Sequence, residues 1–159
     1  MKQRKLSHYN EAGAASMVDV SAKAPTSRSA IARAFVAMPP EVIAALPRNK
    51  KGDPLEVARI AGISAAKKTS ELIPLCHQLP LSHVALDFQI GAEGIEIIAS
   101  ARTVAQTGVE MEAMTAAAIA ALTIYDMTKA LSKSIEIREI QLLEKRGGKS
   151  GTFRRGRAK

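Results

Sequence analysis

Two alanine-rich segments with helical periodicity constrain the fold of this chain more than any other feature. They span residues 50–72 and 107–131, and each begins with a capping box, D-x-x-E at 53–56 and T-x-x-E at 107–110. The first helix should end near Leu72, because the following proline at position 74 disfavours helical geometry before it. Each helix needs a surface against which to bury its small side chains.

Strand-like segments provide that surface. Residues 28–38, 83–90, 94–104 and 135–143 alternate between apolar and polar side chains. In the last segment the alternation slips near Arg138, which predicts a β-bulge. The order strand, helix, strand, strand, helix, strand predicts an α+β ferredoxin-like sandwich, with a four-stranded antiparallel sheet and two long helices on one face. Apolar residues on the other face favour oligomerisation through the sheet.

The length of 159 residues and the apolar content of 47% fit one folded domain. We expect a flexible N-terminus at 1–15, a single domain at 16–152 and a basic flexible tail at 153–159. The chain shows no signal-peptide pattern and no apolar run of the ~20 residues that a membrane span needs. With only one cysteine, it suits a reducing compartment, and we expect a cytoplasmic location.

A net charge of +8 indicates an anionic partner, namely a nucleic acid, a nucleotide or another phosphate compound. Aromatic residues make up 3% of the chain, which is a poor supply of platforms for base stacking. An RNA recognition motif shares the predicted element order, but Phe88 is the only aromatic residue on the two central hairpin strands. We therefore expect neither a nucleic-acid partner nor a membrane partner.

The second helix carries a stripe of candidate functional residues. At 100° per residue, Glu112, Ile119 and Asp126 share one face, and Lys129 lies within reach of Asp126. Along the axis, Glu112 lies about 21 Å from Asp126, at 1.5 Å per residue. The acid–lysine pair is either a solvated surface ion pair or, since Leu122 is on the same stripe, a partly buried pair suited to proton transfer.

The stretch PLCHQLPLSH at 74–83 places a cysteine and a histidine side by side between prolines. Cys76 and His77 have no second close-spaced pair for zinc, and adjacent side chains of an extended backbone point apart, which disfavours a nucleophile–base pair. A buried thiol beside a capped histidine and a stiff ligand-binding loop both stay open. GGKSG at 147–151 lacks the first glycine of a P-loop, but its amides and Lys149 suit phosphate.

Three stretches resemble a known family: MVDVSAK at 17–23, KGD through LIPLCHQLPLSHV at 51–84, and GVEMEA through YDMTKAL at 108–131. With GGKSG, the resemblance covers roughly residues 15–152. The family is that of molybdenum cofactor biosynthesis protein C, the cyclic pyranopterin monophosphate synthases. The resemblance implies a lyase with a ferredoxin-like fold, which converts a cyclised dihydroguanosine triphosphate to cyclic pyranopterin monophosphate and diphosphate. It also implies a homohexamer, a trimer of dimers, with active sites between subunits.

The resemblance also implies roles for individual residues. The catalytic positions fall on Asp126, Lys51 and Lys129. The substrate contacts fall on Leu75, Cys76, His77, Met111 and Glu112, and triphosphate contacts on Arg28, Lys67 and Lys149. Gln78 and Thr128 depart from the family pattern without removing any of these groups.

The implied chemistry has the two lysines as general acid and base, with Asp126 beside Lys129. We expect these three residues to meet His77 in one cleft that a second subunit completes, because one helix face cannot enclose a triphosphate nucleotide. No carboxylate cluster predicts a dedicated metal site, and Mg²⁺ with the triphosphate stays open. A regulatory oligomer without catalysis is the remaining alternative, and the complete set of catalytic positions disfavours it.

Overall fold

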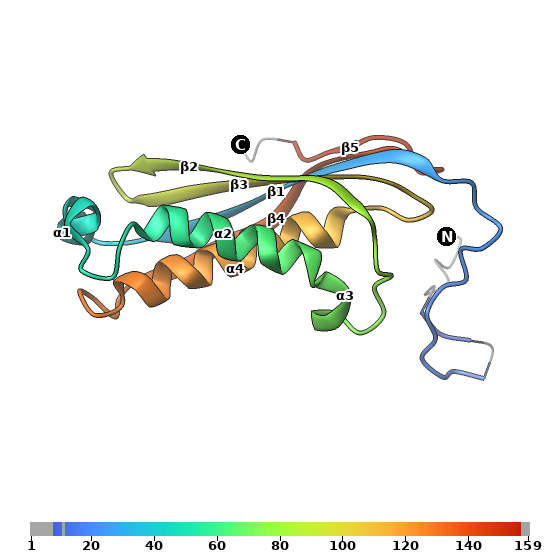
Figure 1. Ribbon diagram of the computed structural model, residues 1–159, viewed down its shortest axis with the longest axis horizontal. Helices are drawn as coiled ribbons and strands as arrows, with labels where there is room; N and C mark the ends of the chain where they lie inside the picture. The colour runs from blue at the N-terminus through green and yellow to red at the C-terminus, as the bar shows by residue number, and fades with distance from the viewer. Residues whose placement is uncertain (1–7, 11, 157–159) are drawn as a thin grey trace.

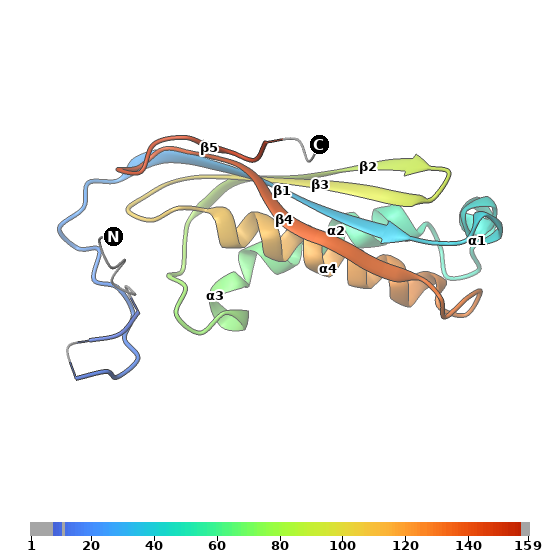
Figure 2. The same ribbon diagram turned by 180° about the vertical axis from the view of Figure 1, so that it is seen from behind.

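The computed structural model describes residues 8–10 and 12–156 of the chain. A five-stranded antiparallel sheet has its two long helices on one face (Figures 1 and 2). The elements in chain order are β1 Thr26–Ala37, α1 Pro40–Ala45, the 3₁₀ turn η1 Leu46–Arg48, α2 Pro54–Lys67, α3 Thr69–Leu72, β2 Leu81–Gly91, β3 Gly94–Ala105, α4 Glu110–Thr128, β4 Glu136–Arg146 and β5 Phe153–Arg154.

The strand order is β2-β3-β1-β4-β5. The four long strands are those that the sequence predicts. The predicted number of four strands is wrong, because a fifth, short strand, β5, pairs with β4 near Lys145. The predicted bulge is confirmed, because the register of β4 against β1 shifts next to Arg138. Glu139 at this shift has a φ of 56°, a left-handed conformation that is uncommon for residues other than glycine.

Small side chains let the helices approach the sheet and each other, as the alanine content predicts. Ala32 and Ala34 of β1 are fully buried under α4, where Ala116 and Ala120 are also fully buried. The two long helices run antiparallel (Figure 1). At their crossing, a Cβ built on Gly62 would lie 2.9 Å from the carbonyl oxygen of Ala116, so only glycine fits there.

The start of α2 confirms half of the first predicted capping box. Asp53 Oδ1 accepts a hydrogen bond from the Leu55 amide at 2.9 Å, which is a helix N-cap. Glu56 does not reach back, because its carboxylate pairs with Arg59 at 3.0 Å. The predicted single helix to Leu72 is interrupted at Lys68, where the backbone leaves the helical region, and the last turn is a separate helix.

The second predicted capping box is wrong. Helix α4 begins at Glu110 after Val109, and no side chain caps it. The Glu110 carboxylate folds back against Gly108. It lies so close that a Cβ built on that glycine would overlap the Glu110 side-chain atoms. Glu110 therefore lies beside the chain that enters α4 and is free to line a cavity there.

The sheet face opposite the helices is mixed in character. Arg33 at its centre pairs with Glu96 and with Glu139, each at 2.5 Å. Val104 on the same strand face as Glu96 is 59% exposed. Among residues 8–10 and 12–156, no helix combines the length and apolar character needed to cross a bilayer.

Candidate functional site

Helix α4 carries predicted functional residues at both of its ends. At the C-terminal end, Lys129 Nζ lies 2.6 Å from Asp126 Oδ1, and Lys51 Nζ lies 3.9 Å from Asp126 Oδ2. Lys51 also donates to the Asp126 carbonyl oxygen at 3.0 Å. We call these three residues the lysine–aspartate cluster. The structure thus brings together all three positions to which the resemblance assigns catalysis.

The cluster lies on the surface of the single chain. The side chains of Asp126 and Lys129 are 59% and 49% exposed and Leu122 is also exposed, so within one chain the pair is the solvated alternative of the two that the sequence leaves open. A hydrogen bond and the charge of Lys129 lower the pKa of Asp126 below its ordinary value. The same contacts raise the pKa of Lys129, so the carboxylate holds this lysine in its charged form.

Asn49 positions Lys51 and was missed by sequence reasoning. Its side-chain amide donates to the carbonyl oxygen of Met127 at 2.9 Å. Its side-chain oxygen accepts from the Lys51 amide, also at 2.9 Å. One asparagine therefore links the loop before α2 to the end of α4. The sequence does not predict this link, because an asparagine two residues before a lysine is a common arrangement.

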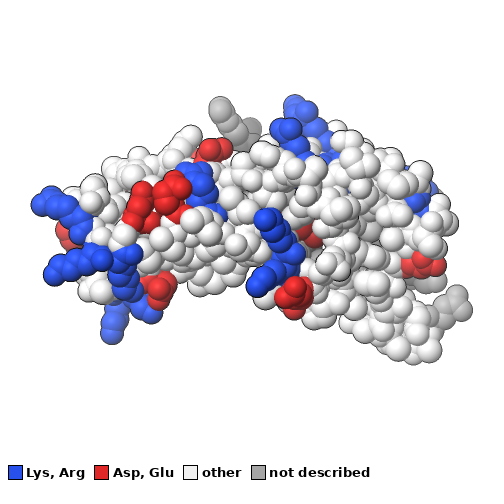
Figure 3. Space-filling view, in the orientation of Figure 1, with Lys and Arg blue, Asp and Glu red and all other residues white. Residues whose placement is uncertain are grey.

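A hollow of about 630 Å³ lies next to the cluster, with Met127 and Leu131 on one wall and Arg48, Lys50 and Lys51 on its rim. Figure 3 shows Lys and Arg side chains gathered at this end of the molecule, near α1. The cluster therefore borders an apolar hollow with a basic rim, which suits an anionic ligand with an apolar or planar part.

At the other end of α4, a cavity of about 550 Å³ collects most of the predicted substrate contacts. We call it the His77 cavity. It is lined by Leu75, Cys76, His77, Met111, Glu112, Arg28 and Lys149. Of the predicted contacts, only Lys67 is not part of its lining. The residues that sequence reasoning missed are His8, Val18, Val20, Lys23, Leu79, Gln106, Thr107, Gly108, Glu110 and Ser150.

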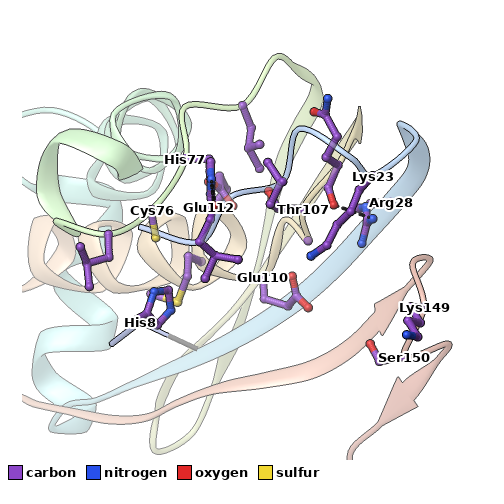
Figure 4. A pocket seen from close by; sticks show the side chains of 17 residues that line it. His8, Lys23, Arg28, Cys76, His77, Thr107, Glu110, Glu112, Lys149 and Ser150 are labelled. Atoms are coloured by element: carbon purple, nitrogen blue, oxygen red, sulfur yellow. Dashed lines mark hydrogen bonds between the residues drawn. The ribbon is translucent and has the colours of Figure 1, made fainter. Parts of the chain in front are cut away.

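One side of the His77 cavity is acidic. Glu112 is 4% exposed, and burial raises its pKa to about 7. Burial, with a smaller contribution from Glu112, also raises the pKa of the Cys76 thiol, so this cysteine is a poor nucleophile. Figure 4 shows Cys76, His77 and Glu112 on the same side of the cavity. A protonated or half-protonated carboxyl beside an imidazole can exchange hydrogen bonds with a polar heterocycle.

The opposite side of the cavity is cationic, with Lys23 and Arg28 near each other and Lys149 beyond them (Figure 4). Arg28 Nε donates to the Ala105 carbonyl at 2.9 Å, and Nη2 donates to the Gln106 carbonyl at 2.9 Å. Its remaining N–H groups are next to Gly148, which has a φ of 75°. The GGKSG turn therefore packs on Arg28 and presents Lys149 to the cavity.

The segment around MVDVSAK forms a further wall. The Val18 carbonyl oxygen lies 2.8 Å from His77 Nε2. Because a carbonyl only accepts, Nε2 carries the hydrogen, and Nδ1 is the nitrogen left for a ligand. Asp19 then accepts from the Ser21 amide at 2.9 Å, a turn after which Lys23 returns to the cavity. This D-x-S pattern is a turn signal that could have found Lys23.

The lysine–aspartate cluster and the His77 cavity are separate within one chain. Glu112 and Asp126 lie at opposite ends of α4, about 21 Å apart along the helix. A straight helix holds the two groups apart within one chain, so the convergence of Lys51, Lys129 and Asp126 with His77 in a cleft between subunits stays a prediction. In the part of the chain that the structure describes, no group of three or more His, Cys, Asp or Glu side chains could hold a metal ion.

Comparison with known proteins places these residues in a family. The sequence profile of the MoaC family matches residues 17–148. The chain is 57% identical over 154 residues to the cyclic pyranopterin monophosphate synthase of Geobacter metallireducens, with 94% of this chain and 96% of the relative covered. It is 55% identical over 152 residues to that of Dinoroseobacter shibae, covering 93% and 96%, and 54% identical over 156 residues to that of Chloroflexus aurantiacus, covering 96% of each.

Proposed function

Because this chain belongs to the MoaC family, we propose that it is a cyclic pyranopterin monophosphate synthase. It converts 3′,8-cyclo-7,8-dihydroguanosine 5′-triphosphate to cyclic pyranopterin monophosphate and diphosphate, an early step of molybdenum cofactor biosynthesis. The observation that carries the proposal is the polarity of the His77 cavity, which has Glu112 and His77 on one side and, across it, three cations that outnumber the single carboxylate of Glu110 beside them. A purine-derived triphosphate has this same division between heterocycle and anion.

The substrate lies in the His77 cavity with its heterocycle at Glu112, His77 and Cys76. Its triphosphate extends toward Lys23, Arg28 and Lys149, where ammonium and guanidinium groups can neutralise the phosphate oxygens. Lys67 is a further phosphate ligand outside the cavity lining. This is supported by its position in the last turn of α2, which lies at the same end of the helix pair as the start of α4.

The active site is shared between two subunits of a homohexamer, a trimer of dimers. Within one chain the lysine–aspartate cluster is about 21 Å from Glu112, so a second copy must bring its cluster to the His77 cavity. The apolar hollow beside the cluster supports this proposal, since an enclosed site needs a surface that closes against it. The mixed open face of the sheet supplies a second surface for assembly.

In the shared site, Lys51 and Lys129 supply the general acid and base of the ring rearrangement. Asp126 holds Lys129 charged, which is supported by the raised pKa of this lysine. A ribose-derived hydroxyl gives its proton to the lysine that acts as the base and forms the new ester bond to the α-phosphorus, the bond from this phosphorus to the β-phosphate bridge oxygen breaks, and diphosphate leaves with the electron pair of that bond. Cations at the triphosphate stabilise the charge that develops on the leaving group. Mg²⁺ bound to the triphosphate belongs to this proposal as a companion of the substrate.

We also propose a ferredoxin-like fold and a cytoplasmic location for the reaction. A ferredoxin-like sandwich is supported by the order β4-β1-β3-β2 of the long strands and by the two long helices on one face. A cytoplasmic reaction is supported by the single cysteine, which suits a reducing compartment. An RNA-binding role is disfavoured, because Phe88 packs against the core and Arg59 Cζ lies over its ring at 5.0 Å from the centroid, so contacts within the protein already use this ring.

The test is incubation of the purified protein with the cyclised nucleotide, followed by separate detection of pyranopterin and diphosphate. We expect both products in equal amounts. The proposal fails if the folded protein leaves the nucleotide unchanged, or if diphosphate appears without a pyranopterin. A Lys51→Ala variant is the control for a contaminating activity.

A further inference from the structure

The N-terminal segment contains a compact turn just before the cavity wall. We call residues 8–10 and 12–23 the N-terminal clasp. The Asn10 side-chain oxygen accepts from the amides of Ala12 at 3.0 Å and Ala14 at 2.9 Å. The Ser16 amide donates to the His8 carbonyl at 2.9 Å, and Gly13 adopts a φ of 77°. These bonds close a short hairpin that fixes the position of His8.

The clasp rests on the body of the protein through few polar contacts. Within the described residues, its one hydrogen bond to the body joins Val18 to His77 at 2.8 Å. Tyr9 and Met17 of the clasp are 56% and 53% exposed. A segment with an internal hairpin and one outside hydrogen bond can move as a unit, because opening it breaks little.

His8 lines the His77 cavity, away from the cations. Figure 4 shows His8 on the side of Cys76 and Glu112, while Lys23, Arg28 and Lys149 lie across the cavity. Among the described lining residues, His8 and His77 have the only aromatic rings. His77 is held through Nε2 by the clasp, whereas the His8 ring forms no hydrogen bond with the residues that the structure describes, so we take His8 as the ring that adjusts to a ligand.

We propose that the N-terminal clasp is part of the ligand site and that His8 is a specificity-determining residue, whose imidazole ring stacks on the heterocycle of the bound nucleotide. The inference rests on the proposed function, because it takes the ligand to be a purine-derived triphosphate. The hairpin built on Asn10 holds the ring at the heterocycle side, and Val18 joins closure of the clasp to the orientation of His77. Lys23, Arg28 and Lys149, on the other side of the cavity, bind the phosphates.

The experiment compares two ligands by calorimetry at fixed pH and salt, using the full chain. The ligands are GTP, which has a purine and a triphosphate, and inorganic triphosphate, which has no ring. His8→Ala should weaken GTP binding about tenfold, as expected for loss of one base-stacking contact, and should leave inorganic triphosphate binding unchanged. His8→Phe, which keeps a planar ring, should retain most of the affinity for GTP. Tyr9→Ala, in the same hairpin but outside the cavity lining, is the matched control.

A second measurement follows the clasp itself. Amide hydrogen exchange of residues 12–23 should slow when GTP is added to the wild type, and should slow much less in His8→Ala. Equal binding of GTP by wild type and His8→Ala, equal losses for both ligands, or a wild type that does not bind GTP would each overturn the inference. Turnover of the cyclised nucleotide is measured separately. A His8 effect without turnover rejects the proposed function alone, and turnover without a His8 effect rejects the clasp alone.

Discussion

Lys129 Nζ lies 2.6 Å from the carboxylate of Asp126, three residues earlier on the exposed last turn of α4. An exposed pair of this kind adds little to stability. It does keep the lysine charged, since the pKa of Lys129 is raised by its hydrogen bond to Asp126. Folding therefore gives little reason for the pair, and the role that we propose for it is in proton transfer.

The first prediction separates these two roles. Asp126→Asn keeps the shape of the side chain but removes the charge that holds Lys129, so kcat should fall by a factor of about 10² or more, the range for a disabled general acid or base. Because Asp126 is exposed, the Tm should not change. Glu136→Gln breaks another exposed ion pair, with Arg138, and neither residue lines the His77 cavity or the hollow beside the cluster, so this variant should keep full turnover. Full turnover by a folded Asp126→Asn protein would contradict the assigned role.

The second prediction concerns the separation of the lysine–aspartate cluster from the His77 cavity. Asp126→Ala and His77→Ala proteins should each be inactive. If each site takes its cluster from one subunit and its cavity from another, unfolding and refolding a mixture should restore part of the activity. Random pairing in equal amounts restores roughly a quarter of the sites, since one mixed pairing in two carries one intact site of two. A mixture that stays inactive, although mass spectrometry shows mixed oligomers, rules out the shared site.

The third prediction follows from the buried carboxyl of Glu112, whose pKa rises from 4.5 to about 7 on folding. Between these pH values, the unfolded chain has released a proton that the folded protein retains. The free energy of unfolding should therefore decrease as pH rises from about 4.5 to 7, and level off above. The pKa difference corresponds to about 3 kcal/mol, and water in the open cavity makes the effect smaller.

Glu112→Gln tests this prediction, because the amide cannot ionise. Urea denaturation at several pH values should show a smaller fall in stability with pH for the variant than for the wild type, and a more stable variant at pH 8. Glu71→Gln, which removes an exposed carboxylate of α3 that does not act on Glu112, is the matched control. Parallel pH curves for wild type and Glu112→Gln would mean that Glu112 is ionised in the folded protein throughout this range.

Local sequence patterns predicted most of the elements. The four long strands, the Asp53 cap and the bulge beside Arg138 each depend on a few neighbouring residues, so the sequence shows them. The short strand β5 was missed because two residues carry no periodicity. The start of α4 was misplaced because the Glu110 carboxylate packs against Gly108 instead of closing a capping box with Thr107. A T-x-x-E pattern cannot decide between these two contacts.

The site was harder to predict than the fold. The lysine–aspartate cluster was found, because its members are spaced by one helical turn or joined by the resemblance. Asn49, Lys23 and His8 were missed, since each reaches its site through a loop whose path is set by a few side-chain hydrogen bonds. Glu112 and Asp126 lie on one stripe of α4, and the sequence did not predict that the first is buried and the second exposed. Their burial depends on where α2 and the 74–80 loop end.

The fourth prediction concerns the crossing of α2 and α4. A Cβ on Gly62 would lie 2.6 Å from Leu86 Cδ2 and 2.9 Å from the Ala116 carbonyl oxygen. Gly62→Ala should therefore destabilise the protein by about 1–3 kcal/mol, in the range of overpacked cores, despite the better helix propensity of alanine. Ile60→Ala, on the exposed side of α2, should cost much less. Urea denaturation measures both, and a Gly62→Ala protein as stable as the wild type would show that the helices can separate without cost.

The last prediction uses two glycines of the GGKSG turn. Gly148 has a φ of 75° and Gly151 a φ of 65°, so alanine at either position costs about 1 kcal/mol or more of backbone strain. They differ in surroundings: a Cβ on Gly148 would clash with Arg28 Nη1, whereas a Cβ on Gly151 would meet nothing within 4 Å. Gly148→Ala should displace Arg28 or Lys149 and so raise the KM for the cyclised nucleotide several-fold, with kcat less affected. Gly151→Ala, with the same strain and no clash, should keep the KM of the wild type. Equal KM values for the two variants would show that contact between the turn and Arg28 does not determine the KM, because the clash is the only difference that the geometry assigns to them.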